Sequence, residues 1–350
     1  MSRAPLRVIQ WTTGNVGRRA LRAVVRHPNL ELVGVFAHTS DKAGRDAADL
    51  CGADEDTGVV ATTDVDALLA LSADACSYNP MWPDTDTLCA LLESGVNVCS
   101  TAGFITGRAT GEETVRRLLT AAERGRSTMF GTGINPGFAN LFALLSTQIC
   151  DRIEQIRVLE SADASTYESK HTQESVGFGH RLDALDLLER TRAGSAVFAD
   201  AVAMMADGLD VELDAITFDA DYAAATADND LGFMVIPEGT VAAIDGRWRG
   251  RVGDRDLIVL NYQWIMGRHV EAPFPLRHGY FVEIDGEPGV RAQLQIVPPP
   301  DWNEPDYMGL GMIMTAMPAV NAIPAVVAAP PGIATHLTLP LVTARGFADT

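Results

Sequence analysis

The stretch Trp11-Thr12-Thr13-Gly14-Asn15-Val16-Gly17-Arg18 decides the fold class of the N-terminal part of this chain. It follows the apolar run 6–11, typical of a buried strand, and opens the amphipathic segment 16–26, typical of a helix. Its spacing matches the GxGxxG fingerprint of dinucleotide-binding folds, with Thr12 in the place of the first glycine. This order of elements predicts a pyrophosphate bound at the helix N-terminus. The residues expected to contact the dinucleotide here are Thr12, Thr13, Gly14, Asn15, Val16 and Gly17.

The second strand of the pattern, 32–37, indicates which dinucleotide is bound. NAD-dependent proteins usually carry an acidic residue at the end of this strand, where it binds the ribose 2′-hydroxyl. Here the strand runs into His38-Thr39-Ser40-Asp41-Lys42, so hydroxyl groups and a lysine occupy the region of a 2′-phosphate. We therefore expect His38, Thr39, Ser40 and Lys42 to bind NADP(H). The alternative is that Asp41 is the ribose acid and that NAD(H) is the cofactor.

The charge and composition exclude several classes of partner. The chain has 350 residues, with 46 acidic and 27 basic side chains and a formal net charge of −19. Nucleic acids and anionic membranes bind positive surfaces, so neither is expected as a partner. Only two basic residues, Lys42 and Lys170, are lysines. The N-terminus lacks the pattern of a signal peptide, and the five cysteines form no CxxC pair, which predicts a cytoplasmic protein without a metal site or disulfide framework.

The alternation of apolar runs divides the chain into three regions. Up to about residue 150, strand-like runs (6–11, 30–37, 73–78, 96–100 and 128–131) alternate with helix-like segments (16–26, 84–94 and 112–124). This pattern predicts an α/β fold, with an N-terminal Rossmann domain around a parallel sheet. From 151 to 305, strand-like runs (153–162, 215–224, 239–244, 257–266, 280–284 and 290–297) accompany helices at 182–191 and 196–207. They predict a second, α+β domain with a mainly antiparallel open sheet.

Three further features complete this organisation. The dipeptides Asp245-Gly246, Gly253-Asp254 and Asp285-Gly286 are expected at turns between strands of the second domain. The stretch from 200 to 245 holds eleven acidic residues and no Lys or Arg, which indicates a solvated face or, alternatively, a cation site. The region 306–350 contains an uncharged stretch long enough to span a membrane, but its prolines indicate a kinked helix that returns to the first domain.

Polar residues follow the other predicted strands of the first domain. Asn79-Pro80, Ser100 and Thr101 come directly after two of these strands, on the edge where Rossmann ligands bind, and we expect them to contact the nicotinamide ribose. Asn135 follows the strand 128–131, between glycines and before a proline. Its amide is expected to bind the nicotinamide carboxamide or the substrate. The alternative is an Asx-turn that caps the next helix.

Several of these segments resemble one known family. The segments 12–17 and 33–45, the run Gly131-Thr132-Gly133-Ile134-Asn135-Pro136-Gly137-Phe138, and the C-terminal runs 320–324 and 329–333 resemble the 2,4-diaminopentanoate dehydrogenase and native amine dehydrogenase group. This group belongs to the dihydrodipicolinate reductase-like superfamily. The resemblance implies a homodimer that transfers hydride between a nicotinamide and a carbon bearing nitrogen or oxygen. Within the matching C-terminal run, Asn321 is a further candidate for the cofactor site.

The sequence departs from this family after the strand 96–100. Amine dehydrogenases of the group place a glutamate shortly after a Ser-Thr pair, whereas here Ser100-Thr101 is followed by Ala102-Gly103-Phe104 and the next carboxylate is Glu112. Deprotonation of an amine needs a base near the reacting carbon. Tyr167 and His171, in a polar loop of the second domain, are the candidate catalytic groups beside Asn135, and Glu160 is a further possibility. The alternative for the loop is a solvated segment without a catalytic role.

These observations together predict an NAD(P)-dependent oxidoreductase that acts on a small, fairly apolar substrate. The pocket is expected to be lined by Phe104, Phe138, Tyr167, Phe178 and Trp264. The resemblance implies oxidative deamination and reductive amination. The missing glutamate leaves carbonyl reduction without amine chemistry as one alternative, and a nucleotide-binding redox sensor as another.

Overall fold

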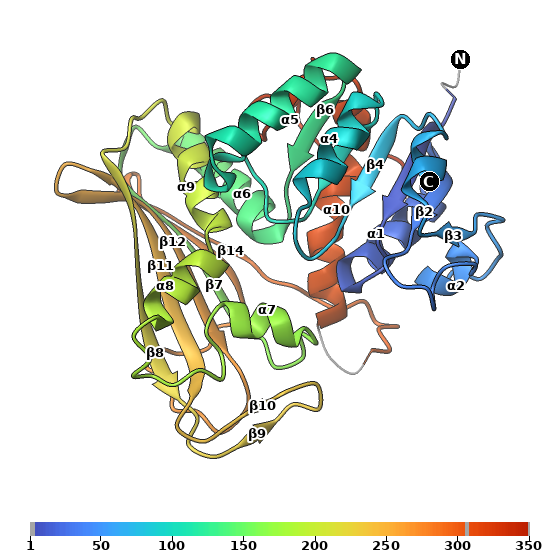
Figure 1. Cartoon of the computed structure of the whole chain (residues 1–350). Helices are drawn as coiled ribbons and strands as arrows, with labels where there is room; N and C mark the ends of the chain where they lie inside the picture. The colour runs from blue at the N-terminus through green and yellow to red at the C-terminus, as the bar shows by residue number, and fades with distance from the viewer. Residues whose placement is uncertain (1–3, 305–307, 349–350) are drawn as a thin grey trace. The chain divides into compact units, whose positions relative to one another are not determined.

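The computed structural model describes residues 4–304 and 308–348, which fold as two compact units (Figure 1). Unit 1 holds the chain up to Phe138 and again from Gly309, and unit 2 holds Ala139–Met308. The division falls earlier than the predicted boundary at residue 150, because helix α6 (Ala139–Ser146) packs against α9 and β7 of unit 2. The chain from Gly309 onward belongs to unit 1.

Unit 1 is built on a parallel sheet of seven strands in the order β15-β6-β5-β4-β1-β2-β3. The predicted parallel sheet of a Rossmann domain is thereby confirmed. The strand order runs outward from β1 in both directions, and in open α/β sheets ligands bind at such a switch point. The strands are β1 (Leu6–Trp11), β2 (Leu30–Phe36), β3 (Ala61–Thr62), β4 (Ala75–Tyr78), β5 (Asn97–Ser100), β6 (Thr128–Gly131) and β15 (Gly332–Ala334).

The helices of unit 1 begin where the sequence supplies caps. The carboxylates of Asp46, Asp64 and Asp84 each accept a hydrogen bond from a backbone N–H of the first turn of the helix that follows. The helices are α1 (Asn15–Arg26), α2 (Ala47–Cys51), α3 (Val65–Leu69), α4 (Thr85–Glu93), α5 (Glu112–Gly125) and α10 (Met308–Val327), with a single 3₁₀ turn at Arg108–Thr110.

Helix α10 matches a membrane span in length and apolar composition. Its residues Ala316, Ala319, Val320, Ala322 and Ile323 are nevertheless fully buried in a core that also contains strands of the unit 1 sheet. Pro318 and Pro324 lie inside the helix. The helix therefore has the environment of a core helix in a globular domain, as its prolines indicated.

Unit 2 contains a six-stranded sheet in the order β14-β13-β7-β12-β11-β8. All neighbouring strands are antiparallel except β7 and β12, which are parallel, so the predicted mainly antiparallel sheet is confirmed. The strands are β7 (Arg152–Asp163), β8 (Ala215–Ala224), β11 (Val241–Val252), β12 (Arg255–Ile265), β13 (Gly279–Glu287) and β14 (Val290–Leu294). A separate pair joins β9 (Asn229–Asp230) to β10 (Val235–Ile236).

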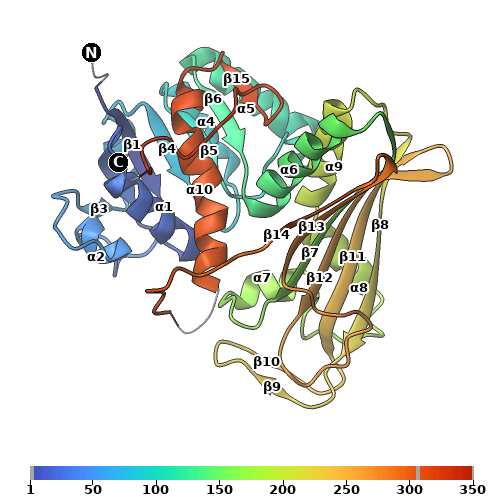
Figure 2. The same ribbon diagram turned by 180° about the vertical axis from the view of Figure 1, so that it is seen from behind.

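The helices of unit 2 are α6, α7 (Lys170–Ser175), α8 (Leu187–Gly194) and α9 (Val197–Gly208), with a 3₁₀ turn at Thr147–Ile149. Of these helices, α6, α8 and α9 pack against the six-stranded sheet and α7 packs against α8, and Figure 2 shows the strands from behind. The prediction of a helix from 182 was wrong at its start, because α8 begins only after Asp186.

Two predicted turns of unit 2 lie inside strands instead. Asp245-Gly246 is part of β11, where a Cβ at Gly246 would meet the Tyr262 ring at 2.2 Å. Asp285-Gly286 is part of β13, where a Cβ at Gly286 would meet the Arg152 carbonyl oxygen at 2.0 Å. Each glycine therefore permits close packing across the sheet rather than a turn.

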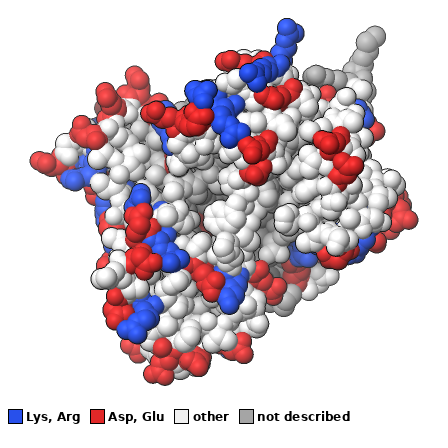
Figure 3. Space-filling model, in the orientation of Figure 1, with Lys and Arg blue, Asp and Glu red and all other residues white. Residues whose placement is uncertain are grey.

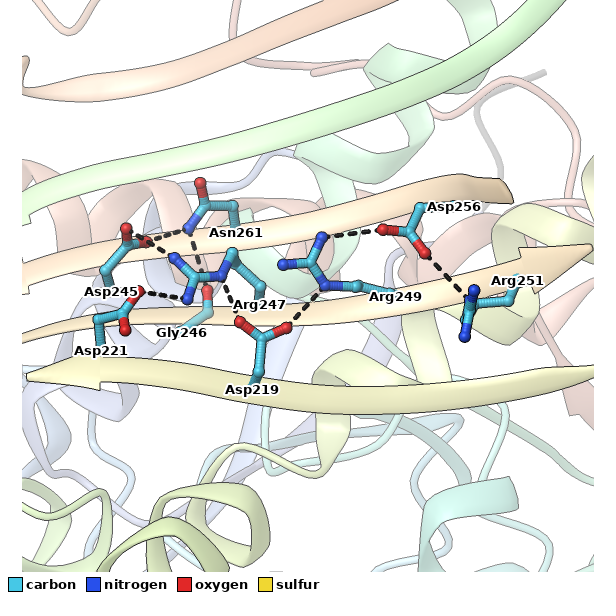
Figure 4. Close-up of polar contacts among 9 residues, drawn as sticks. All are labelled: Asp219, Asp221, Asp245, Gly246, Arg247, Arg249, Arg251, Asp256 and Asn261. Carbon is cyan, nitrogen blue, oxygen red and sulfur yellow. Dashed lines mark hydrogen bonds and ion pairs between the residues drawn. The ribbon is translucent and has the colours of Figure 1, made fainter. Parts of the chain in front are cut away.

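The open face of the unit 2 sheet carries a ladder of arginine and aspartate side chains (Figure 4). Arg247 reaches Asp219, Asp221 and Asp245 at 2.6, 2.5 and 3.0 Å. Arg249 joins Asp219 to Asp256 at 2.7 and 2.9 Å. Part of the acidic stretch 200–245 is thus neither a merely solvated face nor a cation site, because arginines of β11 neutralise it. In Figure 3, basic side chains likewise lie among the acidic side chains of the face shown.

Candidate dinucleotide site

The glycine turn of unit 1 has the backbone conformation that the fingerprint requires. Thr12 adopts a left-handed φ of 68°, the conformation that favours a glycine at the first position of the motif. Gly14 caps α1 with its backbone, and Gly17 lies so close to the turn that a Cβ there would meet the Thr12 carbonyl oxygen at 2.5 Å. Thr12 therefore takes the first-glycine role and Gly17 the helix-packing role.

The polar atoms around this turn fit a dinucleotide. The hydroxyl oxygens of Thr12 and Thr13 and the Oε1 of Gln10 are buried and have no hydrogen-bond partner in the protein. The first turn of α1 contains no acidic residue, and its N–H groups have no partner within the helix. A Cβ at Gly14 would meet nothing within 4 Å, so the surface above the turn is open. Unpaired donors at an open, acid-free helix N-terminus suit an anionic ligand.

A chain of buried amides links this turn to the ends of β4 and β5. Gln10 Nε2 donates to the Thr12 carbonyl oxygen at 2.9 Å and to Asn79 Oδ1 at 2.8 Å. Asn79 Nδ2 in turn donates to the Thr101 hydroxyl at 2.9 Å. The predicted residues Asn79 and Thr101 thus lie on the same sheet edge as the glycine turn. Gln10 is not among the predicted residues, because it lies among apolar residues of the buried strand β1.

The loop after β2 places a lysine against the glycine turn. Lys42 Nζ donates to the Thr13 carbonyl oxygen at 3.2 Å. His38, Thr39 and Ser40 are exposed on the same loop. A hydrogen bond from the Thr39 side chain lowers the pKa of Asp41, which keeps this carboxylate ionised and occupied with its own loop. One cation and several hydroxyl groups therefore border the turn, beside a carboxylate.

The loop after β5 contains no carboxylate that faces the sheet edge. Ser100 is fully buried and accepts a hydrogen bond from the Ala102 backbone N–H at 3.0 Å, and Pro80 is half-buried after β4. Phe104 and Ile105 pack into the interior of unit 1, with exposed fractions of 2% and 1%. The expectation that Phe104 lines a pocket was therefore wrong, since its apolar ring is buried in the core of unit 1.

The turn after β6 carries Asn135, half-buried and in an extended conformation. The Phe138 backbone N–H closes this turn on the Gly133 carbonyl oxygen at 2.8 Å. Beneath it, the Thr132 hydroxyl lies 2.8 Å from His336 Nε2. His336 is not among the predicted residues, because the strand β15 that precedes it is only three residues long.

The remaining cofactor candidate of unit 1, Asn321, lies on α10. Its Oδ1 is buried and has no hydrogen-bond partner in the protein. Residues on either side of it, Val320 and Ala322, belong to the core cluster against which Val16 of α1 packs. Asn321 therefore resembles Thr12 and Thr13, because each has a buried side-chain oxygen without a hydrogen-bond partner in the protein.

The catalytic candidates of unit 2 lie between β7 and α8. Burial raises the pKa of Tyr167, opposed by a hydrogen bond with the Thr172 side chain. His171 is exposed on α7. Glu160 accepts a hydrogen bond from Trp264 Nε1 at 3.0 Å, which ties it and Trp264 to the sheet. Phe178 is fully buried.

Metal-ligand clusters and reactive cysteines are two other features that often mark an active site. Over residues 4–304 and 308–348, no group of three His, Cys, Asp or Glu residues is placed to hold a metal ion. The five cysteines are free thiols, and burial raises the pKa of Cys76 and Cys99. The described site is therefore one of backbone N–H groups, amides, hydroxyls and a lysine.

Comparison with known proteins identifies the family of this chain. Residues 139–347 match the family described as the 2,4-diaminopentanoate dehydrogenase C-terminal domain. The chain is 30% identical to an amine dehydrogenase of Streptomyces virginiae over 97% of both chains. It is 25% identical to the 2,4-diaminopentanoate dehydrogenase of Acetoanaerobium sticklandii, over 96% of this chain and 94% of that protein.

A solved structure shares the fold. The amine dehydrogenase of Mycobacterium smegmatis is 20% identical in sequence and superposes with a TM-score of 0.79, over 97% of this chain and 98% of that one. Together with these relatives, the fold and the glycine turn assign the chain to the NAD(P)-dependent dehydrogenases. Within that class, the chain belongs to the family of 2,4-diaminopentanoate dehydrogenase and the amine dehydrogenases.

Proposed function

We propose that this protein catalyses NADP(H)-dependent oxidative deamination of a small, fairly apolar amine, and the reverse reductive amination. An alkylammonium ion, NADP⁺ and water would give the carbonyl compound, ammonium, NADPH and a proton. The observation that carries this proposal is the relationship to the Streptomyces virginiae amine dehydrogenase, which extends over nearly the whole of both chains.

Residues of unit 1 would hold the cofactor. The backbone from Thr12 to Gly17 would bind the pyrophosphate, and Lys42 with Thr39 and Ser40 would bind the 2′-phosphate. Asn79 and Thr101 would orient the nicotinamide ribose. The hydrogen bond from Lys42 to the Thr13 carbonyl supports NADP over NAD, because it holds a cation beside the phosphate-binding turn, where a further phosphate would gain a charge-assisted contact.

The protein would supply orientation and a path for protons, whereas NADP⁺ supplies the hydride acceptor when bound. The Asn135 amide would hold the nicotinamide carboxamide or the substrate. The loop after Ser100 lacks a carboxylate and so offers no base. Tyr167 or His171 would therefore transfer the proton. Because burial raises the pKa of Tyr167, its phenol would stay protonated and act as a hydrogen-bond donor rather than a base.

One observation favours a second candidate function. The loop 101–107 contains no Asp or Glu, so the glutamate that the family resemblance implies after the Ser-Thr pair is missing. A carbonyl reductase needs only a proton donor beside the carbonyl oxygen, and a phenol such as that of Tyr167 is sufficient. Reduction of a ketone or aldehyde to an alcohol is therefore the alternative.

A substrate panel tests the proposal. We would follow NADP⁺ reduction with small aliphatic and aromatic amines, each paired with the alcohol of the same carbon skeleton. The proposal predicts turnover with amines and none with the matched alcohols. Turnover with the alcohols alone would establish the second candidate.

We also propose that the protein acts as a homodimer, as its family resemblance implies, and that it does so in the cytoplasm, as its cysteine usage predicts. Light scattering of the purified chain tests the assembly. A mass of two chains supports the proposal, and a mass of one chain contradicts it.

A further inference from the structure

His336 reaches the predicted nicotinamide edge by continuing the register of the unit 1 sheet. Strand β15 pairs with β6 in parallel, with Ala334 opposite Phe130. His336 and Thr132 lie two residues beyond this pair, and His336 Nε2 is 2.8 Å from the Thr132 hydroxyl oxygen. The imidazole also packs edge-on against the Phe130 ring, with centroids 5.1 Å apart. The imidazole is thus held by two separate contacts.

Thr132 occupies the space directly beneath the turn that carries Asn135. Its exposed fraction is 3%, and its backbone N–H donates to the Ser100 carbonyl oxygen at 2.9 Å. A Cβ at Gly137 would lie 2.7 Å from the Thr132 hydroxyl oxygen. The turn therefore packs closely against this oxygen, and position 137 needs a glycine. Gly137 has a φ of 138°, which glycine adopts without strain.

We propose that His336 is a positioning residue that, through the Thr132 hydroxyl, fixes the turn carrying Asn135. The hydrogen bond sets the rotamer of Thr132, and that rotamer determines where the backbone of the turn lies. This inference rests on the proposed function only in its statement that Asn135 contacts the nicotinamide or the substrate. The imidazole acts here as a neutral group, because burial lowers the pKa of His336 to about 4.

Four single variants and one double variant test this role. Thr132→Val and His336→Leu each remove the hydrogen bond while keeping a side chain of similar volume. Thr132→Ser keeps the hydroxyl, and His336→Gln keeps a polar nitrogen near the position of Nε2. A small misplacement of a substrate-positioning group lowers catalysis roughly 10- to 100-fold, so we expect that loss in kcat for Thr132→Val and His336→Leu.

Two features separate positioning from a general loss of stability. The double variant Thr132→Val/His336→Leu should lose no more kcat than either single variant, since both remove one interaction. Thr132→Ser and His336→Gln should retain kcat within about threefold of the wild type. The proposal would be overturned if the double variant lost kcat by the product of the two single losses. It would also be overturned if His336→Leu kept the kcat of the wild type.

Hydrogen exchange gives a readout that does not depend on activity. The Phe138 backbone N–H closes the turn on Gly133, so its exchange rate reports the order of the turn. In the protein without cofactor, we expect faster exchange in peptides covering 133–138 for Thr132→Val and His336→Leu, and unchanged exchange in β1 and β4. Unchanged exchange at 133–138 would overturn the inference, even if no substrate were found. Faster exchange there, with no turnover by the wild type, would support the inference and contradict the proposed function.

Discussion

Lys42 Nζ donates a hydrogen bond to the Thr13 carbonyl oxygen at 3.2 Å, so one of the two lysines of the chain touches the glycine turn. The chain carries a net charge of −19, and its proposed cofactor is itself a polyanion. A local arrangement of positive charge and N–H groups must therefore bind the cofactor against the field of the whole protein. We expect Lys42 and the N-terminus of α1 to provide that arrangement.

Replacing Lys42 by alanine is predicted to weaken NADPH binding selectively. Loss of one charge-assisted contact to phosphate should raise the KM for NADPH roughly tenfold and leave that for NADH within about twofold. The matched control is Lys170→Ala, because Lys170 is exposed on α7 and pairs with Glu174 at 3.7 Å. Equal NADPH constants for Lys42→Ala and the wild type would contradict the assignment of NADP.

The two glycines of the turn are predicted to respond differently to alanine. Gly14→Ala meets no atom within 4 Å, so the free energy of unfolding should fall by less than about 1 kcal/mol, while dinucleotide affinity falls because the methyl group occupies the open surface. Gly17→Ala places a Cβ 2.5 Å from a backbone oxygen and should destabilise the fold by about 1–3 kcal/mol. Urea unfolding with and without NADPH distinguishes the two outcomes. If Gly14→Ala bound NADPH as well as the wild type, the open surface would not be the pyrophosphate site.

Thr12→Gly is predicted to stabilise the protein without cofactor. The left-handed φ of 68° strains a threonine, and relief of that strain outweighs the added flexibility of glycine by up to about 1 kcal/mol. Thr13, which does not have a positive φ, is the matched control, and Thr13→Gly should destabilise. Urea unfolding gives both values. A less stable Thr12→Gly variant would show that the Thr12 side chain contributes more than its strained backbone costs.

Asp219 in the arginine–aspartate ladder is predicted to make stability depend on acid pH. Burial would raise the pKa of Asp219, but hydrogen bonds from Arg249 and Arg247 outweigh it, and the pKa lies below its ordinary value. A lowered folded-state pKa stabilises the protein above a pH of about 4 and loses that contribution as the pH falls through the folded pKa.

Asp219→Asn should therefore cost about 1 kcal/mol at neutral pH, a modest value because the side chain is 44% exposed. The difference from the wild type should shrink as the pH falls below about 4, where the wild-type carboxylate takes up a proton. Urea unfolding across this pH range measures it. A difference that stays constant with pH would show that the charge of Asp219 does not stabilise the fold. Asp183→Asn, at an exposed pair with Arg181, is the control and should change nothing measurable.

The fold of unit 1 follows closely from its sequence. The strands β1 and β6 lie at the predicted residues, because each is a short apolar run buried on both faces and bounded by turn residues. The unit 2 sheet was harder to predict where it contains glycine. Asp245-Gly246 has the composition of a turn, and only the ring of Tyr262 on the neighbouring strand reveals why a glycine stands inside β11.

Some residues of the candidate site could be predicted from the sequence and others could not. Thr12 and Gly17 follow from a local motif, whose spacing is visible in the chain. Gln10 and His336 do not, since their roles depend on hydrogen bonds to Asn79 and Thr132, at sequence separations of 69 and 204 residues. A single sequence without its fold contains no local signal for such pairs.

The dependence of turnover on ammonium tests the central claim most directly. We would measure NADPH oxidation with a panel of small ketones and aldehydes, in parallel reactions with and without ammonium. The proposed amine dehydrogenase activity predicts NADPH oxidation only when ammonium is present, with the amine as product. NADPH oxidation at the same rate without ammonium, with the alcohol as product, would contradict it.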